Sequence, residues 1–468
     1  MELQLPSLFL LLVPILLLPL LAIVTRSSRR SDLPPGPPRL PIIGSLHYLA
    51  TALPHRALAA LAGTYGPLML LRIGQIDLAV VTSREAAEAV LKTHDTNFAS
   101  RPEMAAPKII GYGCTDIAFS PYGAYWRQLR KICVMELLSA KRVKSFSSLR
   151  TEEIAGFLKD IAGAAARQTP VNISLKLMSL ANNIVCRATF GKMFKHQSRF
   201  LVIVKETLEM TSGFSLSDLF PSLRFLDVIM MRKITKVHRE MDAIFDDTIQ
   251  DHQERPRKPD GEEDLLDVLL KAREQKDLEV PVTYENVKAV MLDMFAGGTE
   301  TSSTIIEWAI SELIKSPISW QRHKQEVREA LRKRDPPSSP SLGPEGLPRD
   351  LHHSRVYDTA GTRVVINVWA LGRDPKYWED PEKFMRSGSR VTRWTTREQL
   401  RVPAFRCWPK DLPWDDFWIG NRRLPGDMKI EDLDMTETLG ASAPRKEQLH
   451  LMRSRRFRYQ SNKKSSPR

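Results

Sequence analysis

A succession of amphipathic segments with the spacing of α-helices fills most of the chain, and this feature constrains the fold most strongly. In chain order these segments are the Ala/Leu-rich Leu53–Leu61, then Arg84–Lys92, Ala124–Leu138, Ala140–Ala166, Asn172–Phe190, Ser198–Thr211, Asp227–Gln253, Glu262–Gln275, Tyr284–Lys315 and Ser319–Arg334. Strand-like runs are few: a hairpin of Pro67–Ile73 and Ile76–Thr82, and a later run Thr362–Trp369. No fixed-period repeat is visible, so a solenoid is excluded. The pattern predicts a mainly α body with a small β region, of the α+β class.

Composition excludes several other classes. The 468 residues are 42% hydrophobic and 26% charged, which allows a large core and argues against both a polytopic membrane protein and a disordered chain. Four cysteines without a Cys-x-x-Cys pair exclude a disulfide scaffold and the common structural zinc sites, and they indicate a reducing compartment.

The net charge of +14 is unevenly distributed along the chain. Residues 385–468 hold 19 basic and 10 acidic residues and contribute 19 − 10 = +9, which leaves 14 − 9 = +5 for residues 1–384. The excess lies in the tail and no recognition module accompanies it, so we expect no nucleic-acid partner.

The N-terminal span Leu3–Thr25 contains no charged residue. As a helix it would be about 34 Å long, enough to cross the hydrocarbon core of a bilayer. A cleaved secretory signal is the alternative, but Glu2 stands where such signals carry a base, and no small-x-small cleavage site follows. We therefore predict a single transmembrane anchor over residues 1–25.

A basic and Pro-rich hinge follows over residues 26–45. Arg26, Arg29 and Arg30 lie just after the span and predict, by the positive-inside rule, that the rest of the chain faces the cytosol. The prolines of segment 33–44 exclude helix and predict a stiff, extended connector that holds the body at a fixed attitude to the membrane. An ordinary Pro-rich linker is the alternative.

The most informative motif is the segment Asp293–Ser303, inside the long helical stretch. Gly297 and Gly298 each cost about 1 kcal/mol relative to Ala in a helix interior, and the nearby hydroxyls compete for backbone carbonyls. The missing side chains would let a flat or diatomic ligand approach the backbone, while Glu300 and Thr301 set a carboxylate beside a hydroxyl for proton relay. A kinked packing helix with solvated polar residues is the alternative.

A second cluster is Tyr122–Lys131, in which Trp126 and Arg130 fall one turn apart on a helix face. An indole N–H and a guanidinium group placed in this way could hold a carboxylate. A buried tryptophan beside a surface arginine is the alternative.

Together with the Pro-rich hinge, these motifs resemble the membrane-anchored plant cytochrome P-450 monooxygenases of the large microsomal (A-type) group. The hinge Leu33–Pro37 matches the family, as do Phe98–Pro102 before the substrate loop, Trp126–Arg130 on the helix that contacts the haem propionates, the oxygen-binding motif Gly297–Ser302, the segments Ala360–Val364 and Asn367–Pro375 that lead toward the haem loop, and Pro381–Phe384 after them. The resemblance implies the cytochrome P-450 fold over residues 46–384.

The resemblance also implies an activity. It is that of a haem-thiolate enzyme that inserts one oxygen atom of O2 into a small lipophilic specialised metabolite. It implies haem b as cofactor, electrons from NADPH through a membrane-bound reductase, contact with membrane lipid, and location in the endoplasmic reticulum membrane. Glu300 and Thr301 would deliver protons, Trp126 and Arg130 would pair with the haem propionates, and Gly297 and Gly298 would border the cofactor.

Two family elements are altered in this chain. The family carries a Glu-x-x-Arg helix about sixty residues after the oxygen-binding motif, where this chain has the Pro-rich segment 335–358. Glu329 and Arg332 have the right spacing but lie earlier, and an ordinary surface ion pair is the alternative for them.

The haem loop of the family, Phe-x-x-Gly-x-Arg-x-Cys-x-Gly, is not reproduced. The nearest stretch is Pro403–Pro409, which contains Cys407 but no glycine. Cys407 is the candidate axial ligand because the other cysteines, Cys114, Cys133 and Cys186, all precede the oxygen-binding helix. A plain exposed thiol is the alternative.

Residues 385–468 form an atypical basic region in which family similarity returns at 424–446. Loss and recovery of similarity suggest a shifted reading frame or misjoined exons, so that the C-terminal core of the fold would be incomplete. The alternative to an active monooxygenase is therefore a catalytically inactive, haem-free relative.

Overall fold

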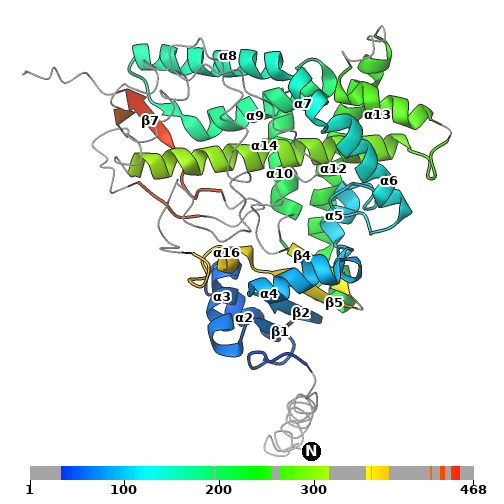
Figure 1. Cartoon of the computed structure of the whole chain (residues 1–468), viewed down its shortest axis with the longest axis vertical. Coiled ribbons are helices and arrows are strands. Elements are labelled where there is room, and N and C mark those ends of the chain that lie inside the picture. The colour runs from blue at the N-terminus through cyan, green and yellow to red at the C-terminus, as the bar shows by residue number, and fades with distance from the viewer. Residues whose placement is uncertain are drawn as a thin grey trace, which may run out of the picture.

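The computed structural model describes residues 33–193, 197–211, 213–255, 263–275, 277–315, 355–359, 361–378, 422–423, 433–437 and 444–453. One long helix, α14 (Tyr284–Lys315), crosses the middle of the molecule, and other helices surround it (Figure 1). The bounds of α14 are those that the sequence predicted. The mainly α architecture with a small β region is confirmed.

The helical body is built around α14. Its larger helices are α8 (Ser147–Ala166), α9 (Ile173–Phe190), α10 (Gln197–Thr211), α12 (Val228–Gln253) and α13 (Leu265–Glu274). Shorter helices are α5 (Ala105–Ile110), α6 (Ala124–Ile132), α7 (Ala140–Ser145) and α11 (Leu216–Leu219). The predicted helix Ser319–Arg334 lies outside the described residues.

Some predicted helices are divided. The segment Ala140–Ala166 breaks between α7 and α8 at Phe146, whose ring packs against the main core. The segments Arg84–Lys92 and Ala124–Leu138 begin as α4 (Arg84–Glu88) and α6, and each ends in a π-helical turn.

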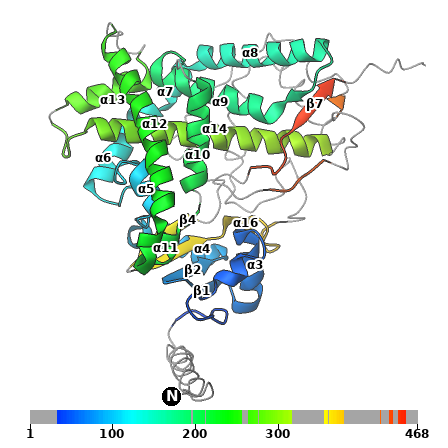
Figure 2. The same cartoon turned by 180° about the vertical axis from the view of Figure 1, so that it is seen from behind.

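A four-stranded sheet lies at one end of the body, with α2 (Leu46–Leu49), α3 (Pro54–Tyr65), α4 and α16 (Val368–Leu371) beside it (Figures 1 and 2). Its order is β1-β2-β5-β4, from strands β1 (Leu68–Ile73), β2 (Ile76–Val81), β4 (Arg355–Thr359) and β5 (Thr362–Ile366). β2 pairs antiparallel with β1 and parallel with β5, and β4 pairs antiparallel with β5.

The predicted hairpin is confirmed, with Ile73 paired to Ile76 across its turn. Gly74 has a φ of 60°, and a Cβ there would lie 2.6 Å from the carbonyl oxygen of Leu219. Only glycine fits this turn, because both its backbone angle and its close neighbour exclude a side chain.

The later strand prediction is too long. β5 ends at Ile366, and Asn367 begins α16 by accepting a hydrogen bond from the backbone N–H of Ala370 at 3.1 Å. The amide of Asn367 also donates to the carbonyl oxygen of His55 at 2.7 Å. A contact with α3 therefore ends the strand.

The main core lies between α14 and helices α9, α10 and α12. Its centre is aromatic: the ring of Phe295 stacks on Phe190 at 5.4 Å between centroids and meets the ring of Phe200 edge-on at 4.8 Å. Phe200 in turn contacts Phe245 on α12. Such ring pairs stabilise beyond the area they bury and fix the position of α14 relative to its neighbours.

The described C-terminal segments, residues 433–437 and 444–453, pack against the body. β7 (His450–Arg453) pairs with β3 (Val171–Asn172) and with β6 (Arg422–Arg423), and Leu433, Leu449 and Leu451 enter a second core cluster. The buried guanidinium of Arg445 donates to the hydroxyl of Ser311 on α14 and, at 2.6 Å, to the carbonyl oxygen of Asp434. The segment where family similarity returns thus contacts the central helix directly.

Among the residues described, no helix combines the length and the apolar character needed to cross a bilayer. The predicted anchor Leu3–Thr25 lies outside these residues, as do Cys407 and the pair Glu329 and Arg332.

Candidate functional site

The candidate site is built on the middle of α14, where the two predicted glycines have different surroundings. A Cβ on Gly298 would lie 2.7 Å from Cγ2 of Val185, so glycine is what allows α9 to approach α14 so closely. At Gly297 no described atom lies within 4 Å of the Cβ position. Gly297 therefore leaves an open notch on one face of the helix, whereas Gly298 serves the contact with α9.

Hydroxyl groups near the notch bind backbone carbonyls one turn back, as the sequence predicted. The Thr301 hydroxyl donates to the carbonyl oxygen of Gly297, and the Ser303 hydroxyl donates to that of Thr299 at 2.8 Å. Glu300 is half-buried beside Thr301. Bonds of this kind weaken a helix and leave a polar group at the notch.

Trp126 and Arg130 lie one turn apart on α6, as predicted. The Arg130 guanidinium is exposed and lies 5.2 Å from the centroid of the Trp126 ring. The indole N–H of Trp126 donates to the carbonyl oxygen of Ile117 at 3.0 Å. A propionate could bind this indole N–H only by displacing the carbonyl oxygen of Ile117 as its acceptor. The donor groups of Arg130 are exposed.

The loop 113–120 contacts both α14 and α6 through hydrogen bonds. The backbone N–H of Ile117 donates to Oδ2 of Asp293 on α14 at 2.6 Å, while its carbonyl oxygen accepts from Trp126. The Tyr125 hydroxyl donates to the carbonyl oxygen of Thr115 at 2.6 Å. The structure thus brings the predicted α6 residues and the start of the α14 motif together through one loop.

Two carboxyl groups face each other in this region, and no role was assigned to either from the sequence. Burial raises the pKa of Asp116 to about 6, although Arg101 and the backbone N–H of Phe119 favour its ionised form. Burial and then the nearby Asp116 raise the pKa of Asp293 well above its usual range. In the sequence, the only sign of this site was Asp293, an acidic residue in a largely apolar stretch before Gly297. Asp116 is distant in sequence and comes close to Asp293 only in the folded chain.

The three described cysteines are structural. Burial is the main cause that raises the pKa of Cys114 to about 11 and those of Cys133 and Cys186 to about 12. Each therefore stays a thiol at neutral pH, and the thiolate is the form that binds metals.

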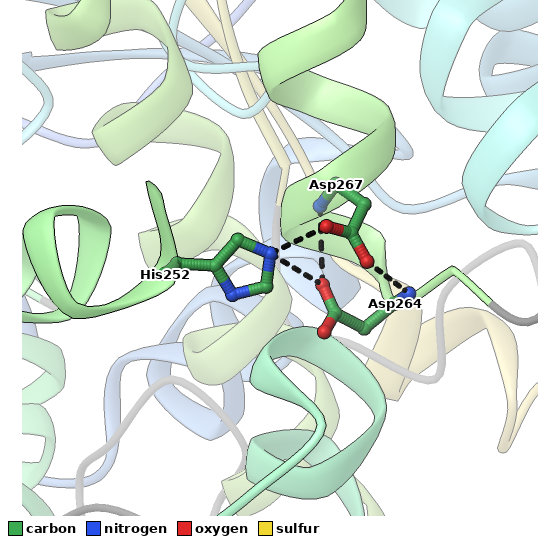
Figure 3. Close-up of side chains that lie close together, drawn as sticks. All are labelled: His252, Asp264 and Asp267. Carbon is green, nitrogen blue, oxygen red and sulfur yellow. Dashed lines mark hydrogen bonds and ion pairs between the residues drawn. The ribbon is translucent and has the colours of Figure 1, made fainter. Parts of the chain in front are cut away.

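One group of potential metal ligands lies elsewhere, between α12 and α13 (Figure 3). Nε2 of His252 lies 2.6 Å from Oδ1 of Asp267 and 3.5 Å from Oδ1 of Asp264. The two aspartates also bind each other's backbone N–H groups, at 2.9 and 3.1 Å, as a capping box that begins α13. These carboxylates therefore have a structural task, and the histidine joins the end of α12 to that cap.

Comparisons with known proteins agree with this architecture. The model of the cytochrome P450 family matches residues 34–343 and 355–408. Cytochrome P450 71D6 of Solanum chacoense is 39% identical over 96% of this chain and 99% of its own length. Premnaspirodiene oxygenase of Hyoscyamus muticus is 38% identical over 91% and 93% of the two chains. Among solved structures, a zebra fish cytochrome P450 with abiraterone superposes with a TM-score of 0.64 at 20% identity and covers 86% of this chain.

The match to the family model, over a mainly α body crossed by one long helix, places this chain in a class of haem-dependent monooxygenases. The chain belongs to the cytochrome P450 family, and its relatives place it in the plant A-type group, as the motifs predicted. Its cofactor is haem, and its electrons come from NADPH through a reductase.

The described residues fit this cofactor. Gly297 leaves bare backbone on an exposed face of α14 where a flat group could approach, and Arg130 presents exposed, forked donors suited to a carboxylate. When bound through a cysteine thiolate, haem supplies the activation of O2.

Proposed function

We propose that this chain is a membrane-anchored monooxygenase that inserts one oxygen atom into a lipophilic specialised metabolite. The observation that carries the proposal is the open notch at Gly297 within a helix that keeps Glu300 and Thr301 beside it. Relatives named premnaspirodiene oxygenase and 5-epiaristolochene 1,3-dihydroxylase, from Hyoscyamus muticus and Nicotiana tabacum, support a hydrocarbon-like substrate.

In this proposal the residues of α14 and α6 have separate tasks. Gly297 borders the cofactor, and Gly298 keeps α14 against α9. Thr301 and Glu300 hold and move protons at the substrate side, where a hydroxyl and a half-buried carboxyl group adjoin the notch. Arg130 binds a haem propionate. Trp126 donates to the same propionate once its indole N–H has left the carbonyl oxygen of Ile117.

Cys407 is the proposed axial ligand. The second range matched by the family model ends at residue 408, directly after this cysteine. The described cysteines are buried thiols, which supports Cys407 by exclusion among the four in the chain.

The proposed location is the endoplasmic reticulum membrane, with the body on the cytosolic side and a reductase as partner. Exposed apolar side chains lie near the hairpin turn, among them Ile42 (82% exposed), Phe225 (65%) and Ile229 (84%). The turn contacts the segments that lead to these residues, because Gly74 donates to the carbonyl oxygen of Ile43 and Gln75 to that of Leu219. Together they offer an apolar surface for lipid at the end of the body where the described hinge begins.

The test is the difference spectrum of the reduced, carbon-monoxide-bound full chain. We expect the Soret band of a thiolate-ligated haem, its loss in Cys407→Ser, and its retention in the control Cys186→Ala. Absence of haem in the wild-type chain would contradict the proposal and leave the inactive, haem-free relative.

The same preparations test the propionate contact. Arg130→Leu should lower the molar ratio of haem to protein several-fold, because a charge-assisted bond to the cofactor is lost. Arg127→Leu is the matched control, since Arg127 lies on the same helix and contacts the Tyr122 ring instead. Equal haem content in the two variants would contradict the role of Arg130.

A further inference from the structure

The backbone of Ile117 is held from both sides. Its N–H donates to Asp293 on α14, and its carbonyl oxygen accepts from Trp126 on α6, at 2.6 and 3.0 Å. The backbone N–H of Ala118 also favours the ionised form of Asp293. One carboxyl group thus binds consecutive amides of the loop 113–120.

We propose that Asp293 is a positioning residue, which fixes the loop 113–120 against α14 one turn before Gly297 and so sets how the substrate lies at the notch. This inference rests on the proposed function for the identity of the pocket. Asp293 does not touch the reacting atoms; it acts through the loop.

The cost of the arrangement supports a task of this kind. The apolar side chains of Ala289–Leu292 and of Phe295 on α14 are buried, and the half-buried Asp293 between them loses much of its hydration. The second carboxyl group, Asp116, is itself buried and adds repulsion. An apolar side chain would avoid both costs but could not accept the loop N–H groups.

The pair makes the hold on the loop dependent on pH. Because both pKa values are raised in the fold, the contribution to stability is complete below the ordinary aspartate pKa and is lost as pH rises through the raised values. We therefore expect the loop to loosen as pH rises through about 6, the pKa of Asp116, and further above it.

Among the residues that the structure describes, the other groups that face the pair do not titrate between pH 5 and 8. They are Arg101 and Cys114 from the loop and its approach, Tyr125 from α6, and Cys133 from the π-helical turn after it. The pKa of Cys114 is raised to about 11, and those of Tyr125 and Cys133 to about 12. A change of loop protection between pH 5 and 8 therefore reports Asp116 and Asp293.

The experiment is amide hydrogen exchange of the full chain, followed by mass spectrometry at pH 5 to 8 and corrected for the intrinsic exchange rate at each pH. Asp293→Ala should lower the protection of Ile117 and Ala118 about tenfold. Asp293→Asn keeps a carbonyl acceptor at this position. It should therefore keep the wild-type protection of Ile117 and Ala118 at low pH, and this protection should depend little on pH. Asp116→Asn should also flatten the pH profile.

Glu307→Gln is the matched control, because Glu307 is a buried carboxyl group on the same helix that binds Ser174 instead of the loop. It should leave the protection and the pH profile of the loop unchanged. Wild-type protection in Asp293→Ala, or a full wild-type pH profile in Asp293→Asn, would overturn the proposal. If Asp293→Ala also loses protection in α9, it is unfolded, and the two asparagine variants decide.

Hydrogen exchange of the loop does not require haem. A chain that fails to bind haem but shows this pattern would contradict the proposed function and leave the positioning contact standing. In a chain that binds haem, Asp293→Ala should in addition raise the spectral Kd of a lipophilic ligand more at pH 5, where the wild-type contact is intact, than at pH 8, in a way that Asp293→Asn does not.

Discussion

Gly297 and Gly298 are neighbours on α14, yet one borders an open notch and the other touches α9. From the sequence both were predicted to let a ligand approach, because two adjacent glycines weaken a helix equally wherever they face. The difference comes from Val185, whose position relative to α14 is set by the packing of two helices. Residue type was therefore readable, but the direction in which each glycine faces was not.

Alanine at these two positions should have opposite effects. Gly298→Ala should lower the free energy of unfolding by about 1–3 kcal/mol, because its Cβ would overlap Cγ2 of Val185. Gly297→Ala should raise it by up to about 1 kcal/mol, since the site is open and alanine favours helix. Urea unfolding followed by circular dichroism measures both, and Val185→Ala should relieve the Gly298→Ala variant. Equal shifts in the two single variants would disprove the assignment.

At the scale of elements, regular and locally determined pieces were predictable. The bounds of α14 and the β1–β2 hairpin followed from periodicity and turn residues. The end of β5 did not, because Asn367 is held by the His55 carbonyl oxygen from a distant part of the chain. The same reason applies to the Asp116–Asp293 pair, which exists only once the loop 113–120 lies on α14.

The C-terminal segment depends on contacts of this distant kind. Glu437 lies 2.9 Å from both Nε2 of His55 and Nη2 of Arg56 on α3. Burial alone would raise the pKa of Glu437, but hydrogen bonds from these two side chains bring it below its usual value. Its ionised form thus holds the segment 433–437 to α3, the helix beside the sheet.

Glu437→Gln should therefore destabilise the fold in a pH-dependent way. Because the pKa is lowered, the contribution is present above the ordinary value of 4.5 and disappears as pH falls through the value in the fold. We expect a loss of about 1–3 kcal/mol at pH 7 that shrinks below pH 4.5. Thermal unfolding of the wild type and the variant from pH 3 to 7 measures the difference. A constant difference across this range would show that ionisation of Glu437 is not responsible.

Across the whole molecule, the sheet lies at one end, and α14 crosses the middle of the helical body (Figure 2). Residue 33, where the described chain begins, leads directly to this end, since Leu70 of β1 donates to the carbonyl oxygen of Pro35 at 2.9 Å. The hinge is thus attached to the sheet, and the sheet end is the one that we expect to face lipid.

Removal of residues 2–25 should shift the protein from firm to weak membrane association. The shortened chain should still bind neutral phospholipid vesicles, because Ile42, Phe225 and Ile229 remain exposed, and it should lose most of that binding when Ile229 is changed to Asp. Vesicle flotation measures each step, with Ile229→Asp in the full chain as control. Unchanged flotation of the doubly altered chain would show that another surface binds lipid.

The order of strands in the sheet also bears on how the chain is made. β2 pairs with β5 in a register that joins Asp77 to Thr362, which are 362 − 77 = 285 residues apart. At synthesis rates of about 5–20 residues per second, the hairpin leaves the ribosome on the order of tens of seconds before its partner strand exists. During that interval the edge of β2 is unpaired and open to association with other chains. Protection of one early strand edge is therefore a requirement for the biosynthesis of this protein, set by its topology.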